Sequence, residues 1–163
     1  MIHIEPITLE NADLFRVVRL RALRESPTAF GSTYARESAF DDAEWVRRIE
    51  RFSGQEGIGF LAMDDAEPCG MAGALIEPCN QAQLVSMWTA PEYRQQGVGR
   101  LLVDAVLAWA VSHGLQLVRL MVTSCNEPAM RFYDSLGFAC TGRIEPYPND
   151  AALVEWEMAR RID

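Results

Sequence analysis

Residues 87–102 read MWTAPEYRQQGVGRLL and place two glycines between a strand pattern and a long helical pattern. Residues 83–89 predict the strand, and residues 99–113 predict the helix. The first turn of a helix leaves backbone N–H groups unpaired and carries about half a positive charge. Because Gly97 and Gly99 let an anion come close to the main chain, this stretch predicts a phosphate-binding loop.

Two well-known phosphate loops do not fit this stretch. The P-loop requires Lys and then Ser or Thr after its second glycine, whereas Arg100 and Leu101 follow Gly99 here. The dinucleotide fingerprint requires a third glycine at the position of Leu102 and a place directly after the first strand. The pattern that remains is R-x-x-G-x-G, beginning at Arg94.

The rest of the chain alternates between strand and helix patterns. Further strands are predicted over residues 2–4, 57–63, 70–76, 115–122, 138–143 and 154–158. Further helices are predicted over residues 13–24, from about residue 41, and over residues 126–136. We expect the first helix to bury Leu14, Val17, Val18, Arg21 and Ala22. We expect the helix at 99–113 to bury Val98, Leu101, Leu102, Ala105, Val106 and Trp109. The order predicts one α/β domain over residues 1–163, a mixed sheet with helices on both faces.

Composition narrows the class of protein. The chain has 163 residues and a net charge of −8, which disfavours nucleic acid as a partner and would steer cationic acceptors toward it. Its four cysteines stand singly, so neither a disulfide framework nor a zinc site is expected, and no metal is predicted. Without a signal-peptide pattern or a membrane-spanning apolar run, a cytoplasmic protein without a membrane partner is expected.

The R-x-x-G-x-G stretch, in its strand–helix context, resembles motif A of the GNAT superfamily of N-acetyltransferases. Residues 126–138, NEPAMRFYDSLGF, resemble motif B of the same superfamily, and the element order over residues 2–159 is similar to that of its small bacterial-type members. The resemblance implies a sheet of about seven mostly antiparallel strands, splayed between the fourth and fifth strands. It also implies acetyl-CoA as co-substrate.

The resemblance further implies roles for particular residues. The loop would bind the pyrophosphate of acetyl-CoA through Arg94, Gln95, Gln96, Gly97, Val98, Gly99 and Arg100. The backbone of Met87, Trp88 and Thr89 would pair with the pantetheine arm, as an added strand would. Asn126 would contact the pantetheine, although its position also suits a helix N-cap. Tyr133 would be the general acid that protonates the leaving thiolate, with packing in the core as the alternative.

The acceptor side is less specified. Related proteins recognise the acceptor between their first two helices, so Phe30 and Tyr34 could form an apolar wall and Glu37 could meet a cationic amine. An ordinary surface loop anchored by aromatic residues is an equally good interpretation. His3 and His113 lie far from the motifs, so we expect the general base to be a carboxylate acting through water, without naming it.

The resulting hypothesis is an acetyl-CoA-dependent N-acetyltransferase. It would transfer acetyl directly, in a ternary complex, to a primary amine of a small molecule, amino acid or peptide. A non-catalytic acyl-CoA sensor and a nucleotide-binding module are the alternatives, and a homodimer stays open. A covalent route through Cys125 is disfavoured, since no histidine or acid is in view, and we expect this cysteine to be buried.

Overall fold

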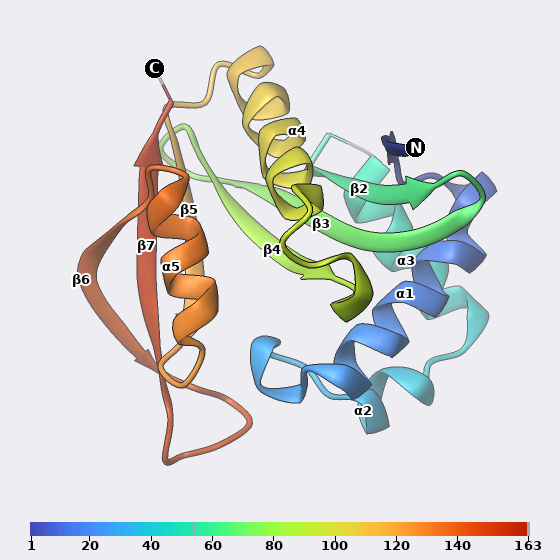
Figure 1. The fold of residues 1–163 in the computed structure, drawn as a ribbon, viewed down its shortest axis with the longest axis horizontal. Helices are drawn as coiled ribbons and strands as arrows, with labels where there is room; N and C mark the ends of the chain where they lie inside the picture. Colours follow the sequence, from blue (N-terminus) through green and yellow to red (C-terminus); the bar gives the residue numbers. More distant parts are fainter. Residues whose placement is uncertain (54, 163) are drawn as a thin grey trace.

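The computed structural model describes residues 1–53 and 55–162 (Figure 1). The strands are β1 (Ile2–Pro6), β2 (Gly57–Asp64), β3 (Glu67–Glu77), β4 (Gln81–Thr89), β5 (Leu117–Thr123), β6 (Ala139–Pro146) and β7 (Val154–Arg161). The α-helices are α1 (Ala12–Glu25), α2 (Tyr34–Ser38), α3 (Asp42–Ser53), α4 (Val98–Ser112) and α5 (Glu127–Ser135). Short 3₁₀ turns are η1 (Leu9–Asn11), η2 (Pro27–Ala29) and η3 (Pro91–Tyr93).

The seven strands form one sheet in the order β1-β2-β3-β4-β5-β7-β6. Every neighbouring pair is antiparallel except β4 and β5, which run parallel and are connected by α4. Hairpin connections join β2 to β3 and β3 to β4, as expected for antiparallel neighbours. The predicted mixed and mostly antiparallel sheet is confirmed.

The sheet divides where β4 and β5 meet. Pairing between them is limited to Gln81↔Leu117, Ala82↔Val118 and Gln83↔Arg119, after which residues 84–89 continue without a β5 partner. β5 continues instead along β7, as far as the pair Thr123↔Glu155. Figure 1 shows the two strands diverging toward the end of β4 that leads into η3. The predicted splay is therefore present.

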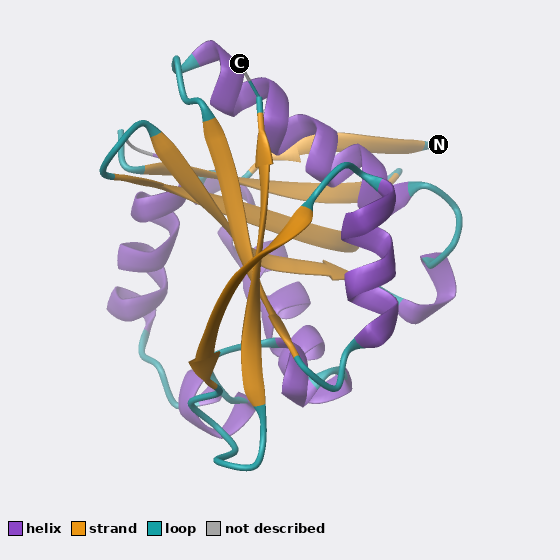
Figure 2. Cartoon of the chain, turned by 90° about the vertical axis from the view of Figure 1, so that its left-hand side faces the viewer, coloured by secondary structure: helices purple, strands orange, loops and turns teal. Residues whose placement is uncertain are grey.

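Helices cover both faces of the sheet (Figure 2). On the α4–α5 face, the core contains buried side chains of α4, α5 and the strands beneath them, among them Leu102, Val106 and Tyr133. On the α1–α3 face, a second core is built around Phe15, Trp45 and other buried side chains of α1 and α3. Apolar residues therefore line both sides of the central strands, as the paired helix layers require.

The buried stripes of α1 and α4 differ from the prediction. Helix α1 buries Phe15, Val18, Arg19, Ala22 and Leu23, whereas Val17 is 60% exposed. The stripe is rotated because Phe15 packs edge-on against Trp45 and Phe52 of α3. In α4, Val103, Leu107 and Ala110 are buried in addition, and the predicted Leu101 is 43% exposed. Helical spacing alone left two neighbouring stripes equally acceptable, and tertiary packing selected one of them.

The segment between α1 and α3 contains more regular structure than the sequence predicted. Residues 34–38 form the short helix α2, whose first turn is capped by Thr33, with the Arg36 N–H donating to the Thr33 hydroxyl at 3.1 Å. Cys125, expected to be buried, is exposed. Among the described residues, no helix is long and apolar enough to cross a membrane.

Candidate active site

A bulge in β4 lies just beyond the point where β5 separates from it. The register with β3 shifts between Gly73↔Val85 and Met71↔Trp88, and Ser86 takes a left-handed φ of 56°. A bulge adds one residue to a strand, bends it and redirects a side chain. As a result, Ser86 faces the α1–α3 side, where its hydroxyl accepts a hydrogen bond from Arg19 at 3.3 Å.

The loop before α4 presents unpaired backbone amides. Gln95 and Gly97 have left-handed φ values of 61° and 85°, and Gly97 is the N-cap of α4 without a side-chain cap. The first hydrogen bond that closes the helix runs from the Leu101 N–H to the Gly97 carbonyl at 3.1 Å. The N–H groups of residues 98–100 therefore have no acceptor within the helix, as the first turn of a helix requires. This arrangement suits an anionic group.

Gly97 and Gly99 have different structural roles in the loop. A Cβ added at Gly97 would have no heavy atom within 4 Å, so the space above this residue is open. A Cβ at Gly99 would lie 3.0 Å from Phe132 of α5 and 3.3 Å from Met87 of β4. Gly99 therefore allows α4 to pack closely on α5 and β4, whereas Gly97 supplies the backbone conformation.

The polar side chains of the loop make contacts within the protein. Arg94 donates to a Glu25 carboxylate oxygen at 2.8 Å and to the Thr89 carbonyl at 3.0 Å. The Gln96 amide donates to the Glu92 carbonyl at 2.9 Å. These contacts hold the two ends of the loop together. Phosphate contact by Arg94 and Gln96 stays a prediction. Phosphate binding by the turn of residues 98–100, in which Val98 is buried and Arg100 exposed, is also a prediction.

The backbone of β4 is the predicted partner of the pantetheine arm. Trp88 is buried on the α1–α3 face, and its indole N–H donates to Glu25 at 2.9 Å. Met87 points to the opposite face, where it packs against the α4–α5 core. Since β5 has left the edge of β4 here, the strand can accept a further extended chain.

Asn126 and Tyr133 lie at the two ends of α5. The Asn126 side chain accepts a hydrogen bond from the Ala129 N–H at 3.3 Å and so caps the helix, as its position predicted. A ligand contact by Asn126 stays a prediction.

Tyr133 is 8% exposed and packs edge-on against Phe132 and Phe138, with ring centroids 5.2 and 5.8 Å away. Its hydroxyl has no hydrogen-bond partner among the described residues, and burial raises its pKa well above the usual value for tyrosine. The phenol is therefore protonated at neutral pH and keeps an unused donor. Both the packing and the acid interpretations remain compatible with this environment.

The three predicted acceptor residues do not form an open wall. Phe30 is buried in the α1–α3 core, with the Arg19 guanidinium 5.0 Å from its ring centroid. Arg24 lies 4.4 Å from the ring centroid of Tyr34 and donates to its hydroxyl at 3.2 Å. An apolar ring gains more by leaving water than by lining an open surface, which explains the burial of Phe30.

Glu37 corrects the sequence-based expectation most clearly. Its side chain is fully buried and forms a two-pronged pair with Arg19, at 2.9 and 2.8 Å, with Arg48 3.6 Å away. Burial alone would raise the pKa of Glu37, but the hydrogen bonds and charge of Arg19 hold it below its usual range. The carboxylate is already neutralised inside the protein, so it is not free to meet an incoming amine.

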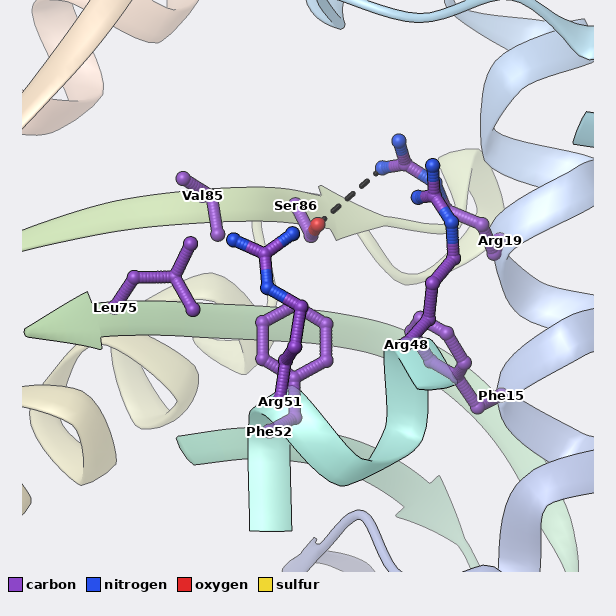
Figure 3. Close-up of a pocket in the computed structure, with 8 residues that line it drawn as sticks. All are labelled: Phe15, Arg19, Arg48, Arg51, Phe52, Leu75, Val85 and Ser86. Carbon is purple, nitrogen blue, oxygen red and sulfur yellow. Dashed lines mark hydrogen bonds between the residues drawn. The ribbon is translucent and has the colours of Figure 1, made fainter. Parts of the chain in front are cut away.

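The cluster of charged side chains around Arg19 was not predicted from the sequence. Three arginines, Arg19 from α1 and Arg48 and Arg51 from α3, gather beside Ser86 of β4 (Figure 3). Only the second stripe of α1 could have indicated that Arg19 is buried, because it follows Phe15 by four residues and precedes Leu23 by four.

A second group that the sequence did not indicate lies across the gap, on β7. Glu155 is paired with Thr123 of β5, so the two side chains share a face. The Thr123 hydroxyl donates at 2.6 Å to the Thr28 carbonyl in η2, which identifies this face as the α1–α3 side. Glu145 of β6 lies directly opposite Glu155. Burial first, and then the charge of Glu145, raises the pKa of Glu155.

The segment that follows α1 connects the two halves of the sheet. The Tyr147 hydroxyl, in the β6–β7 loop, donates to the Pro27 carbonyl at 3.1 Å and also to the Phe30 carbonyl. The Asn149 amide donates to the carbonyls of Phe30 and Ser32, both at 3.1 Å. We call residues 27–32 the bridging segment. Within the described ranges, 1–53 and 55–162, no group of three or more metal-ligating side chains is found.

Comparison with known proteins gives concordant results. A model described as the acetyltransferase (GNAT) family matches residues 20–138. Over 112 residues the chain is 27% identical to the aminoglycoside N(6')-acetyltransferase type 1 of Salmonella typhimurium, covering 64% of this chain and 77% of that protein. Four other curated relatives are matched over only 16–39% of their own length.

Two solved structures show the same fold at low identity. An acetyltransferase of the GNAT family from Streptococcus pneumoniae superposes with a TM-score of 0.82 at 18% identity, over all of both chains. The PaiA N-acetyltransferase of Thermoplasma acidophilum, solved in complex with coenzyme A, gives 0.74 at 18% identity over 99% of each chain.

Proposed function

Because this chain belongs to the GNAT family of acetyltransferases, we propose that it transfers the acetyl group of acetyl-CoA directly to an amine. The observation that carries the proposal is the row of unpaired amides before α4, beside the unpartnered edge of β4. When bound, acetyl-CoA supplies the activated acetyl group as a thioester. Residues 95–100 would hold its diphosphate, and residues 87–89 would hold its extended arm.

The chain's own groups account for the charges and protons of the transfer. Glu155 would accept the proton of the incoming ammonium, directly or through water, because its raised pKa brings a carboxylate closer to the basicity that the task needs. A backbone N–H at the β4 bulge would stabilise the negative charge that develops on the thioester oxygen while nitrogen bonds to carbon.

Tyr133 would supply the last proton. As the carbon–sulfur bond breaks, its hydroxyl would protonate the departing sulfur, and it is suited to donate because burial keeps it protonated. The nitrogen loses two protons in all: one to Glu155 before it attacks, and the other as the tetrahedral intermediate collapses, when it replaces on the Tyr133 oxygen, directly or through water, the proton that Tyr133 gave to the sulfur. The net release is one proton, which Glu155 passes to water.

An amine on a small molecule is the acceptor class we favour. What supports this is the sequence similarity to an aminoglycoside acetyltransferase, a protein that its name assigns to a small-molecule amine. A peptide amine is the other acceptor class that the proposal includes. We also propose that the chain acts as a single domain in the cytoplasm, without a nucleic-acid or membrane partner.

Two measurements test the proposal. Calorimetry should show binding of coenzyme A, and an assay of free thiol released from acetyl-CoA should respond to a panel of amines above a no-acceptor control. Failure of coenzyme A to bind would overturn the proposal. Binding without acetylation of any amine would favour the sensor, and a larger thermal shift with ATP or NAD than with acetyl-CoA would favour the nucleotide-binding module.

A further inference from the structure

A cavity of about 180 Å³ opens on the α1–α3 face beside the β4 bulge. It is lined by Phe15, Arg19, Arg48, Arg51, Phe52, Leu75, Val85 and Ser86. We call it the arginine cavity. Figure 3 shows side chains of α1 and α3 converging on the β4 strand, with Ser86 between the Arg51 guanidinium and those of Arg19 and Arg48.

The charges around the arginine cavity do not balance. Arg19 and Arg48 share the single buried carboxylate of Glu37. Arg51 forms no ion pair or hydrogen bond with the side chains that the structure describes. Arg48 also forms an ion pair with Glu44, whose oxygen lies 3.8 Å from the Arg48 Nε, but Glu44 pairs with Arg47 as well. The cavity therefore carries an excess of positive charge inside a chain whose net charge is −8.

One donor of the cluster is buried without a partner. The Nε of Arg48 is enclosed and has no hydrogen-bond acceptor among the described residues. A buried donor without an acceptor costs about 1–3 kcal/mol, more when the group is charged. The guanidinium groups that line the cavity present their donors in a planar fork that matches the two oxygens of a carboxylate.

We propose that the arginine cavity binds a carboxylate of the acceptor, so that the substrate is an amine that also carries a carboxylate. The inference rests on the proposed function for the transfer step itself. Phe15, Phe52, Leu75 and Val85 supply an apolar lining for the body of such a molecule. Polar groups that fix orientation within an apolar lining are typical of small-molecule sites.

The position of the cavity suits this role. Ser86 belongs both to the cavity and to the bulge beyond which β4 loses its β5 partner, so a ligand in the cavity lies next to the proposed transfer site. Arg51 and Leu75 also line a second hollow of about 320 Å³, together with Gln55, Glu56 and Ile76. Arg51 is exposed, so a carboxylate of the acceptor can reach it from solvent.

The test uses acceptors that differ only in the carboxylate. Linear ω-amino acids of two to six carbons are compared with their primary amides in the thiol-release assay, because the series covers a range of amine-to-carboxylate separations. L-Phenylalanine and L-phenylalaninamide form an aromatic pair. For the best length, we expect kcat/KM to be at least about 10-fold higher for the acid than for the amide.

Arg51→Gln should lower kcat/KM for the preferred acid by about 10–100-fold, mainly through KM. It should lower kcat/KM for the amides far less, so that the preference for the acid is lost, and it should leave the affinity for coenzyme A unchanged. Arg47→Gln is the matched control, because Arg47 lies on the same helix, is exposed and pairs only with Glu44 among the described residues. It should behave as wild type with every acceptor.

Each outcome decides the matter. Transfer to amides as fast as to acids at every length, or an acid preference that survives Arg51→Gln, would overturn the inference while leaving the acetyltransferase intact. If no acceptor is acetylated although coenzyme A binds, the proposed function fails. Calorimetry of the same acids then tests the cavity separately. Acid binding that Arg51→Gln abolishes would support the carboxylate site, and absence of acid binding would overturn it.

Discussion

The α4–α5 face and the α1–α3 face of the sheet build their polar groups in different ways. On the first face, the anion-binding candidates are backbone amides of one short stretch, residues 95–100. On the second, they are the side chains of Arg19 on α1 and of Arg48 and Arg51 on α3. Arg19 is held in place by the carboxylate of Glu37 on α2 and the hydroxyl of Ser86 on β4. An anion-binding site made of backbone amides is therefore encoded by a short stretch of sequence, whereas one made of side chains depends on the complete fold.

The largest effect is expected from breaking the buried pair of the α1–α3 face. Glu37→Gln should lower the free energy of unfolding by about 3–5 kcal/mol, because Arg19 is left charged and buried without its partner. Denaturant unfolding measures the difference. Since the pKa of Glu37 lies below its usual range, its contribution is present above the pKa of the unfolded chain and is lost as pH falls below about 4.

Glu44→Gln is the control, because Glu44 pairs with the exposed Arg47 and reaches Arg48 only at 3.8 Å, so its loss should cost less than about 1 kcal/mol. Equal losses for Glu37→Gln and Glu44→Gln would show that the buried cluster is no more essential to the fold than a surface pair, and would remove the contrast between the faces.

The second effect concerns the general base proposed on the α1–α3 face. Glu155→Gln should lower kcat/KM by about 10²–10³-fold with little change in coenzyme A affinity. In the wild type, kcat/KM should fall as pH drops through the raised pKa of Glu155, because the protonated carboxyl cannot accept a proton. A pH–rate profile measures this acidic limb.

Glu145→Gln tests further whether Glu155 is the group that titrates in the acidic limb. Removing the charge opposite Glu155 should lower the pKa of Glu155 and shift the acidic limb to lower pH. An acidic limb that stays in place in Glu145→Gln, or that persists unchanged in Glu155→Gln, would assign the titration to another group, such as the acceptor amine.

The third effect lies on the α4–α5 face. Tyr133→Phe should lower kcat by about 10–10³-fold, because the ring contacts with Phe132 and Phe138 remain while the proton donor is lost. Steady-state kinetics and coenzyme A calorimetry separate the chemical step from binding. Tyr93→Phe, which removes a hydroxyl that donates to Asp64, should leave kcat near the wild-type value. Full turnover by Tyr133→Phe would reduce Tyr133 to a core residue.

The smallest effect tests the backbone itself. Gly97→Ala should weaken coenzyme A binding by about 5–30-fold, because a left-handed φ of 85° costs an L-residue about 1–2 kcal/mol and the amides move to relieve it. Gly114→Ala is matched, with φ of 69° and equally open space at the other end of α4. Equal dissociation constants for coenzyme A in the two variants would show that the conformation of the loop does not determine coenzyme A affinity.

The sequence predicted what depends on short-range pattern. All seven strands, the helix after the glycine loop and the Asn126 cap follow from periodicity and capping chemistry. The prediction of the buried stripe of α1 was wrong, because Phe15 and Val17 both fit helical spacing and only the packing of α3 against Phe15 selects between them.

The environments of the residues on the proposed acceptor side could not be predicted from the sequence, for a related reason. The burial of Glu37 depends on Arg19, which lies eighteen residues earlier, and on the closing of α3 over both. Glu155 was overlooked because an acidic residue that alternates with apolar ones in a strand is usually solvated. Only the register with Thr123 and Glu145 shows which neighbours it has. These relations are properties of the tertiary structure.

The bridging segment, residues 27–32, has a mechanical consequence. β4 and β5 share only three residue pairs, so the spacing of the two arms at their open end is set largely by what ties them together there. Thr28 and Phe30 receive hydrogen bonds from Thr123 and Tyr147 on the opposite arm. The bridging segment therefore sets the distance between the β4 arm and the β5 arm of the sheet at their open end. A substitution that lengthens or loosens it would change the separation of the two arms, and with it the proposed binding of both substrates, even where it touches neither.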